Sequence, residues 1–530
     1  MFFDSRRSTV HATHGMVATS QPLAAMAGLQ ILMQGGNAVD ASVAAAAVLN
    51  VVEPESTGIG GDMFALIRNA KDGVVHALNG SGRAPAAASP DELLSQGYQQ
   101  IPDSGVYSVS VPGTVHGWET ILNSHGTMSL SEVLAPAIKY AEEGFPVTDI
   151  ISYQWASQAQ KLAQYPSGQE MLKNGRAPRP GEIMKLPTLA RTLKLIAEGG
   201  SEAFYTGEIA EKIATFIQEN GGWMSVDDLA SHTSDWDDPI KTDYRGVTCW
   251  ECPPNGQGIV ALEALNIAEG FDIASMGAQS ADAYHHLIEA TRLAFSDAYQ
   301  YVADPRKSSV PISELISKDY ADGRRNLVDP LKAMKTVPYG KPFGGSDTVY
   351  ISCVDGAGNA CSFINSVFNN FGSGLVAPDT GIVLQNRGAL FSLDKTHPNI
   401  LEPGKRPFHT IIPAMATIGD ELYLCYGVMG GFMQPQGHLQ VLSNMVDFDM
   451  DPQESLNALR FMVMGDAVVL EEGLSNTVIT DLQNRGHDIR FADGYTRVGM
   501  GGAQLIMRDP ESGVLSGGSE PRKDGCAIGW

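Results

Sequence analysis

The sequence predicts a layered α/β protein in which the 530 residues form one body. The middle of the chain, roughly 125–235, contains three segments with helical apolar spacing, each of which ends in glycine. From residue 347 onward, strand-like segments alternate with glycine-rich turns. No internal repeat, low-complexity segment or long linker separates these parts. Helices followed by strands without a spacer favour one layered body over two separate domains.

The first part of the chain predicts two helices and then strands. Residues 22–34 (PLAAMAGLQILMQ) have helical apolar spacing and stop at two glycines, and a second helix of small residues extends from 37 to about 48. MFALIRN at 63–69 and VVHALNG at 74–80 are typical of strands. After the helical middle, a strand pair is expected near 244–256 and further helix at 259–300.

The second part of the chain predicts a β-hairpin. TVYISCVD (348–355), the turn GAGN and ACSFINS (360–366) have the alternation and the glycines that such a hairpin needs. GIVLQN (381–386) and ELYLCYGVMGG (421–431) continue the strand-rich character. A helix is then expected from about Gln436 to Val446.

The charge balance excludes two classes of partner. The formal net charge is −24, from 60 acidic and 36 basic residues. A nucleic-acid-binding protein needs a basic footprint, and docking on anionic lipid needs one too, so we expect neither partner. The most apolar run, 41–52, is too short to cross a bilayer and is interpreted as a buried helix.

We expect a soluble, cytoplasmic protein. The N-terminal stretch MFFDSRRSTVHATHG has no apolar core of signal-peptide length and no small-residue cleavage site. Six cysteines in a chain of 530 residues do not make a disulfide framework, so reduced thiols are expected.

Several common site motifs are absent from the sequence or incomplete. GIGGD (58–62) is neither a dinucleotide fingerprint nor a phosphate loop, and its glycines indicate a close backbone approach. Cys249 and Cys252 have a C-x-x-C spacing without a second pair. His285 and His286 are adjacent, so on a helix they point in different directions and cannot chelate together. No G-x-S-x-G elbow occurs, which leaves a hydrolase triad unsupported.

Thr348 has two interpretations. It is either only the residue that begins a strand after the loop GGSD, or a nucleophile exposed by cutting the chain before it. A threonine at a new N-terminus carries its own base, because its α-amine can accept the hydroxyl proton. Such a residue needs a second hydroxyl and backbone donors for an oxyanion. Ser366 on the hairpin partner offers the first, and Gly430 and Gly431 before a helix offer the second.

With these residues assembled, the chain resembles the γ-glutamyltransferase (glutathione hydrolase) family of N-terminal nucleophile enzymes. The resemblance covers nearly the whole chain, and SRRSTV, QNRG and QPQGH place it nearest to an intracellular bacterial branch. It rests on these motifs: GLQILMQGGNAVDASVAAAAVLNVVEPESTGIGGDMF, PPNGQGIVALEALNIAEGFD, YVADP, DTVYISCVDGAGNACSF, FGSGLVAPDTGIVLQN, PGKRP, GVMGG and EPRKDG.

The resemblance implies a four-layer αββα sandwich made as an inactive precursor. Cleavage between Asp347 and Thr348 gives a large chain 1–347 and a small chain 348–530, which stay together and form, as a possible assembly, a homodimer of heterodimers. The family's nucleophile falls on Thr348, its hydroxyl partner on Ser366, and its oxyanion glycines on Gly430 and Gly431. No metal or organic cofactor is implied.

The implied acyl pocket departs from the family pattern. The family's carboxylate-binding arginine falls on Ser81, and the acidic residue that holds the glutamyl amine falls on Leu390. The neighbouring amide position becomes Arg387, and the paired serines become His409 and Thr410. An ammonium buried beside Leu390 without a carboxylate costs several kcal/mol. The segment 392–402 is also short, so a lid loop found in some members is missing.

Two arginines could replace the lost carboxylate contact. Arg83 shares a strand face with Ser81 if that segment is extended, and Arg387 is the other candidate. Arg83 could equally be part of a surface or interchain ion pair.

The resemblance implies a small-molecule amide substrate, by default a γ-glutamyl amide such as glutathione, cleaved through a covalent acyl-enzyme. Because the glutamate contacts are replaced, a glutaryl, oxamate or β-lactam side-chain amide is the alternative. We expect hydrolysis rather than transfer, since a site without the lid admits water. A second alternative is an inactive binding homologue.

Overall fold

Two seven-stranded sheets form the centre of the molecule. The computed structural model describes residues 7–335, 337 and 348–530. Each sheet is antiparallel throughout. In spatial order, the first sheet contains β1 (Val10–Ala12), β20 (Leu515–Gly518), β19 (Gly502–Arg508), β15 (Glu421–Met429), β14 (Ala414–Ile418), β9 (Val247–Glu251) and β8 (Ile240–Tyr244). The second contains β21 (Cys526–Gly529), β2 (Gly15–Thr19), β10 (Val349–Asp355), β11 (Ala360–Ser366), β3 (Asp62–Arg68), β4 (Val75–Gly80) and β7 (Asp235–Asp237).

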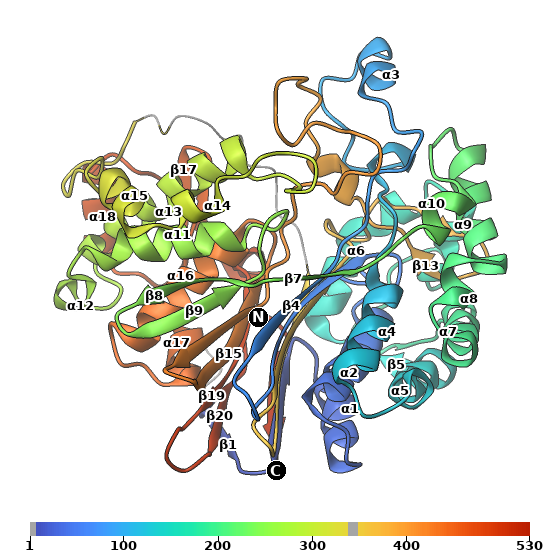
Figure 1. The fold of residues 1–530 in the computed structure, drawn as a ribbon, viewed down its shortest axis with the longest axis horizontal. Helices are drawn as coiled ribbons and strands as arrows, with labels where there is room; N and C mark the ends of the chain where they lie inside the picture. Colours follow the sequence, from blue (N-terminus) through green and yellow to red (C-terminus); the bar gives the residue numbers. More distant parts are fainter. Residues whose placement is uncertain (1–6, 336, 338–347) are drawn as a thin grey trace.

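The two sheets face each other, and helices cover their outer faces (Figure 1). One helical layer packs on the second sheet: α1 (Pro22–Met33), α2 (Ala38–Val52), α4 (Thr114–His125), α5 (Leu130–Glu143), α6 (Asp149–Leu162), α7 (Pro187–Gly199), α8 (Glu202–Tyr205), α9 (Glu208–Glu219) and α10 (Val226–Ala230). The other packs on the first sheet: α11 (Gly258–Glu269), α12 (Ile273–Met276), α13 (Ala281–Tyr301), α14 (Ile312–Leu315), α15 (Lys318–Arg325), α16 (Met433–Val446), α17 (Pro452–Asn457) and α18 (Asn476–Asn484). The expected αββα sandwich is therefore confirmed.

Shorter elements complete the outer parts. They are α3 (Pro90–Ser95), the pairs β5 (Phe145–Pro146) with β6 (Ile183–Met184) and β12 (Val376–Ala377) with β13 (Ile382–Val383), and the small sheet of β16 (Phe461–Met464), β17 (Ala467–Glu471) and β18 (Asp488–Ala492). GIVLQN contributes only the two residues of β13, so the strand expected there is much shorter than its sequence suggests.

The helix α2 shows why the outer layer holds to the sheet. All fifteen of its residues are buried, and most are Ala or Val, so it is apolar on every side. Asn37 caps it in a reciprocal box with Asp40, which satisfies N–H groups that the first turn leaves free. It lies against β10 and β11, as the interpretation of 41–52 as a buried helix requires.

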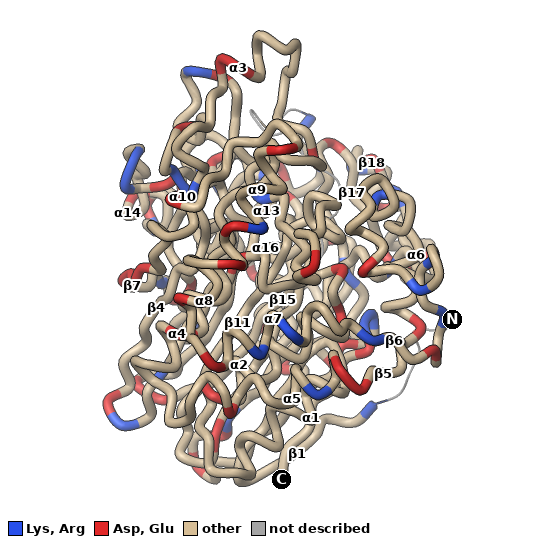
Figure 2. The backbone as a smooth tube through the Cα atoms, turned by 90° about the vertical axis from the view of Figure 1, so that its right-hand side faces the viewer, with Lys and Arg blue, Asp and Glu red and all other residues tan. Residues whose placement is uncertain are grey.

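Three apolar clusters correspond to the layers. One lies between the two sheets and includes Phe64, Tyr350 and Ile506, while the larger two lie between each sheet and its helices. No helix among the described residues combines the length and apolar character that a membrane span requires. Figure 2 shows Lys and Arg interspersed with Asp and Glu along the chain rather than gathered in one stripe.

Candidate active site

Thr348 lies directly before the central strand β10, and its side chain is fully buried. The β10–β11 pairing joins Val349 to Asn365, so the same register places Thr348 opposite Ser366. Thr348 Oγ1 lies 3.2 Å from Ser366 Oγ and 3.5 Å from Gln434 Nε2. The hairpin that the sequence predicts therefore brings two hydroxyl groups together at one end of the second sheet. Asp347, the expected partner in chain cleavage, lies outside the described residues.

Ser366 ends β11 and is held by groups beyond its strand. Its Oγ accepts hydrogen bonds from the Phe368 N–H at 2.8 Å and from Arg387 Nη2 at 3.2 Å. Phe368 has a φ of 78°, a backbone conformation that a bulky residue rarely adopts. The backbone behind Ser366 leaves no room either, since a Cβ on Gly61 would lie 2.3 Å from the Ser366 carbonyl oxygen. This fit confirms a close backbone approach for Gly61.

Gly430 and Gly431 form the turn between β15 and α16. Their φ angles of 121° and 58° lie in the region that favours glycine. Gln257 Nε2 fixes this turn by donating to the carbonyls of Gly431 at 2.8 Å and Thr410 at 2.7 Å. Gln434, in the first turn of α16, both donates toward Thr348 and accepts from the Ile412 N–H at 3.0 Å. The two glycines thus stand at the positive end of a helix whose first turn reaches the Thr348 hydroxyl.

Arg387 is a buried cation beside these hydroxyls. It begins a short 3-10 helix, Arg387–Leu390, and donates from Nη1 to Thr410 Oγ1 at 2.6 Å and from Nη2 to Ser366 Oγ. Its guanidinium also lies over the Phe368 ring, 4.5 Å from the centroid. No carboxylate among the described residues forms an ion pair with it, and its Nε is buried without a hydrogen-bond partner there. Burial lowers the guanidinium pKa to about 9, against the opposing effect of Asp62, so the group stays charged at pH 7.

Asp62 is a central residue that sequence reasoning missed. Its Oδ1 accepts from the N–H groups of Gly82 at 3.0 Å and Gly113 at 3.2 Å, and from Gln385 Nε2 at 2.9 Å. His409 Nε2 donates to its Oδ2 at 3.0 Å. Burial raises the pKa of the Asp62 carboxyl to about 6, although Arg387 and these donors act against it. The acidic residue that ends GIGGD was the available signal, since a lone carboxylate beside an apolar strand must find partners.

His409 is neutral in this site. Burial, with Arg387 and Arg406 nearby, holds its pKa well below the usual range. Its Nδ1 accepts the Ile411 N–H at 3.3 Å, which leaves Nε2 to carry the proton toward Asp62. His409 and Thr410 therefore meet Asp62 and Arg387 respectively, and the residues that replace the family's paired serines belong to this buried polar network.

Two expected pocket residues lie apart from the hydroxyls. Ser81 is buried, donates to Asn79 Oδ1 at 2.7 Å and accepts from Asn255 Nδ2 at 3.3 Å. Arg83 forms an ion pair with Asp235 at 3.1 Å and donates to the Thr233 carbonyl. The structure thus places Arg83 in the ion pair that was its alternative interpretation.

Leu390 lines a cavity of about 760 Å³. Aromatic rings of Tyr299, Phe408 and Phe432 form a stacked wall of this cavity, and Phe432 directly follows the glycine turn. Residues of the short segment 392–402, from Ser392 to Asn399, also line this cavity. Leu390 itself is only 8% exposed, so the position that holds an acidic residue in the family pattern is apolar and close to buried.

The comparisons with known proteins identify the family of the chain. A family model described as gamma-glutamyltranspeptidase matches residues 24–530. The glutathione hydrolase-like YwrD proenzyme of Bacillus subtilis is 39% identical over 98% of this chain and 99% of that protein. The oxamate amidohydrolase proenzyme of Klebsiella pneumoniae is 36% identical with the same two coverages.

The solved structures extend the likeness to the fold. A cephalosporin acylase from Bacillus halodurans is 45% identical, covers 99% of this chain and 97% of its own, and superposes with a TM-score of 0.94. Amide bonds are the common target that these names describe. The chain therefore belongs to the gamma-glutamyltranspeptidase family and is an amide-cleaving enzyme of the N-terminal nucleophile type.

Proposed function

We propose that the protein is an autoprocessed amidohydrolase in which Thr348 is the nucleophile and Arg387 binds a carboxylate on the acyl group of the substrate. The observation that carries the proposal is a fully buried arginine that bonds the Ser366 hydroxyl and has no carboxylate partner among the described residues. A buried cation without a direct ion pair is costly, because Asp62 acts on Arg387 only from beyond ion-pair distance, and an anionic substrate group relieves that cost.

Processing comes first in this proposal. Thr348 Oγ attacks the carbonyl carbon of Asp347, the C–N bond breaks, and an ester replaces the peptide bond while the nitrogen becomes the Thr348 α-amine. Water then hydrolyses the ester, which leaves a large chain 1–347 and a small chain 348–530. The new α-amine supplies the base that the hydroxyl lacked in the precursor.

The same residues then cleave the substrate. The Thr348 hydroxyl gives its proton to the α-amine and attacks the amide carbonyl, with Ser366 holding Oγ in position. The oxyanion lies toward the N–H groups of Gly430 and Gly431 at the start of α16. The α-ammonium returns the proton to the departing amine, and water releases the acid from the acyl-enzyme.

The position of Arg387 favours a short acyl group. Its Nη2 is one hydrogen bond from Ser366 Oγ, which is one hydrogen bond from Thr348 Oγ. A carboxylate bound there is separated from the attacked carbonyl by a few atoms at most, as in an oxalyl amide (an oxamate) or a glutaryl amide. An oxamate amidohydrolase among the relatives supports such a substrate.

A γ-glutamyl amide remains the second candidate, because a relative is named glutathione hydrolase-like. It has the carboxylate at the glutaryl spacing but adds an α-ammonium. Among the described residues, the carboxylate near Arg387 is that of Asp62, which already accepts hydrogen bonds from four donors. At the position where the resemblance implies an acidic residue, this chain has Leu390. The ammonium therefore meets a cation and an apolar side chain, which disfavours γ-glutamyl relative to glutaryl.

A panel of anilides separates these substrates. Glutaryl, oxalyl, γ-glutamyl and uncharged butyryl anilides are compared by kcat/KM in the wild type and in Arg387→Met and Arg387→Lys. We expect the glutaryl or the oxalyl anilide to exceed the γ-glutamyl anilide in the wild type. Arg387→Met should lower kcat/KM for the acidic acyl groups by roughly 10- to 100-fold, the value of a hydrogen bond to a charged group.

The butyryl anilide is the internal control, since its acyl group has no carboxylate. If Arg387→Met slows butyryl and glutaryl anilides equally, Arg387 acts on Ser366 and not on the substrate. If γ-glutamyl anilide is the best wild-type substrate, the assignment of an ammonium-free acyl group is wrong.

A further inference from the structure

A cluster of three buried residues outside the active site has the composition of a metal centre. His285 and Glu289 lie one turn apart on the same face of α13, and His487 directly precedes β18. One ligand atom from each of the three lies within 4.8 Å of the others. His285 and His286 point in different directions and cannot chelate together, but Glu289 on the same helix and His487 from a distant segment both lie close to His285.

The groups behind these side chains orient them toward one another. His285 donates from Nε2 to the Asp329 carbonyl at 2.8 Å, which leaves the lone pair on Nδ1. That Nδ1 faces His487 Nε2 at 2.8 Å. Metal-bound histidines commonly donate their other N–H to a backbone carbonyl in this way, because the bond fixes both tautomer and ring orientation.

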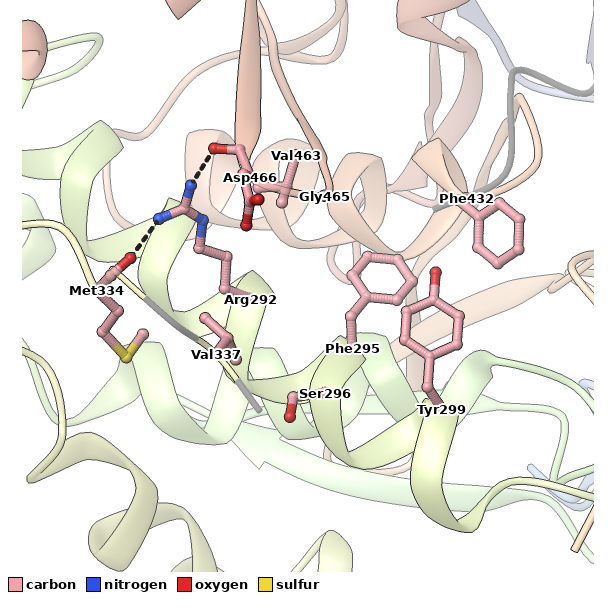
Figure 3. Close-up of a pocket in the computed structure, with 10 residues that line it drawn as sticks. All are labelled: Arg292, Phe295, Ser296, Tyr299, Met334, Val337, Phe432, Val463, Gly465 and Asp466. Atoms are coloured by element: carbon pink, nitrogen blue, oxygen red, sulfur yellow. Dashed lines mark hydrogen bonds between the residues drawn. The ribbon is translucent and has the colours of Figure 1, made fainter. Parts of the chain in front are cut away.

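Glu289 is oriented in the same manner. Its carboxylate accepts from the Met334 N–H at 2.9 Å and from Arg292 Nη1 at 3.1 Å. Arg292 in turn donates to the carbonyls of Met334 and Asp466, as Figure 3 shows. The carboxylate therefore has a fixed position one helical turn from His285 and retains lone pairs for a cation.

The His285–His487 hydrogen bond accounts for one ring nitrogen of His487 and leaves the other unexplained. His487 Nδ1 is buried without a hydrogen-bond partner among the described residues. If Nε2 of His487 turns its lone pair to a metal, the displaced proton has a free position at Nδ1. Nearby positive charge is balanced, since Arg485 pairs with Asp282 and Asp481 and Arg292 pairs with Glu289.

We propose that His285, Glu289 and His487 bind one divalent transition-metal ion, with Zn²⁺ as the best match. Two imidazoles and one carboxylate suit zinc and its neighbours and disfavour Ca²⁺ and Mg²⁺, which prefer oxygen ligands throughout. Three protein ligands leave a fourth position for water. The assignment is independent of the proposed substrate.

The site would fasten three parts of the chain together. Through Asp329 and Met334 it holds the segment 329–334, which leads toward the proposed processing point. His285 and Glu289 precede Thr348 in the chain, and His487 follows it. A bound metal would therefore cross-link the two proposed chains of the processed enzyme.

The test uses untagged full-length protein that has been treated with a chelator and dialysed. Zn²⁺ is titrated by calorimetry, metal content is measured after gel filtration, and Co²⁺ serves as a spectroscopic probe. We expect about one Zn²⁺ per chain and a visible Co²⁺ spectrum of low coordination number. His487→Gln and Glu289→Gln should lose at least ten-fold in affinity, since each removes one ligand.

His286→Gln is the matched control. It changes the same residue type at the next position of α13, where the ring bonds the Asp282 carbonyl and packs on Phe271. It should keep full metal binding. Failure to bind Zn²⁺ above background, or equal binding by the wild type, His487→Gln and Glu289→Gln, would overturn the proposal.

A second measurement covers the case in which a ligand variant does not fold. Hydrogen exchange of the wild type is followed with and without Zn²⁺. Metal should slow exchange at the Ala333 and Met334 amides, because Glu289 holds the Met334 N–H. Unchanged exchange at 329–334 with saturating Zn²⁺ argues against the site.

Discussion

The two hydroxyl residues Thr348 and Ser366 and the buried polar network around Arg387 adjoin one another, yet their residues are brought together in different ways. Thr348 and Ser366 meet because one hairpin register places them opposite each other. Arg387, Asp62 and His409 come from three separate segments and meet only in the complete fold. The proposed chemistry therefore depends on local backbone geometry, whereas the proposed recognition depends on a buried polar network of long-range contacts.

Removal of the nucleophile tests the first region most severely. Thr348→Ala should remain a single chain on a denaturing gel, while the wild type separates into two fragments that meet at Thr348. In precut protein, loss of the hydroxyl should cost about a million-fold in rate, as for other covalent catalysts. An uncut wild-type chain after long incubation would contradict the role of Thr348.

The Asp62 carboxyl tests the polar network through pH. Its folded pKa of about 6 exceeds the ordinary aspartate pKa of 3.8, so the folded state binds more protons between these values. Its contribution to stability is therefore fully present below about pH 4 and is lost as pH rises through about 6. The sign is opposite to that of a carboxylate in a favourable ion pair.

Urea unfolding of the single-chain Thr348→Ala protein measures this effect, with and without Asp62→Asn. Between pH 4 and pH 7, the free energy of unfolding should fall by roughly 2 to 3 kcal/mol more in the background protein than in the Asp62→Asn variant. Equal pH slopes would show that Asp62 is not the titrating group.

Ser366 tests where the two regions join, because its hydroxyl contacts both Thr348 and Arg387. Ser366→Ala should lower kcat by roughly ten- to a hundred-fold, the cost of an unmade hydrogen bond in a buried site. Ser366→Thr keeps the hydroxyl and should stay within a few-fold of the wild type, measured with the preferred anilide. Equal losses in both variants would point to packing and not to the hydroxyl.

A substitution at Leu390 tests substrate preference and leaves Thr348 and Ser366 unchanged. Leu390→Asp returns a carboxylate to the position where the family pattern has an acidic residue. The ratio of γ-glutamyl to glutaryl kcat/KM should rise by about ten-fold, since one ion pair is gained for the ammonium and none for glutaryl. Leu390→Asn is the uncharged control. A ratio that does not change would place the ammonium site elsewhere.

The smallest effect is expected at Arg83. Its ion pair with Asp235 is about a quarter exposed, and such pairs contribute roughly 0.2–1 kcal/mol. Arg83→Ala should leave kcat/KM for glutaryl anilide within about two-fold, because Arg387 rather than Arg83 lies beside the hydroxyls. A large rise in KM would restore Arg83 as the carboxylate clamp.

The sequence predicted the elements whose causes are local. The β10–β11 hairpin, the buried helix α2 and the glycine turn before α16 follow from alternation, small-residue composition and turn chemistry. The resemblance then placed Thr348 and Ser366, which the hairpin register brings within 3.2 Å. GIVLQN failed as a long strand because its residues pack as a two-residue bridge beside β12.

The acyl pocket was predicted only in part: Arg387, His409 and Thr410 lie in the buried polar network, whereas contacts between residues distant in sequence could not be foreseen. Ser81 and Arg83 were both expected in the acyl pocket. In the fold, Ser81 is hydrogen-bonded to Asn79 and Asn255, and Arg83 forms an ion pair with Asp235. Asp62 gave no pattern, since its donors come from positions 82, 113, 385 and 409. The sequence places His286 next to His285, whereas the histidine that faces His285 in the fold lies 202 positions away.

Because strands from both proposed chains pair within the same sheets, the proposed cleavage changes how the protein can refold. β10 pairs with β2 on one side and β11 with β3 on the other, while β21 pairs with β2, and in the other sheet β1 pairs with β20 and β9 with β14. Strands from before and after Thr348 are therefore hydrogen-bonded to each other in both sheets. Hydrolysis of one bond there leaves every ladder in place, yet it makes refolding a second-order process. A processed molecule that unfolds must find its other half at cellular concentration, whereas the precursor carries both halves at a high effective concentration. Maturation would thus be a one-way step. The single precursor chain folds readily, and the processed enzyme then keeps its fold because it unfolds slowly.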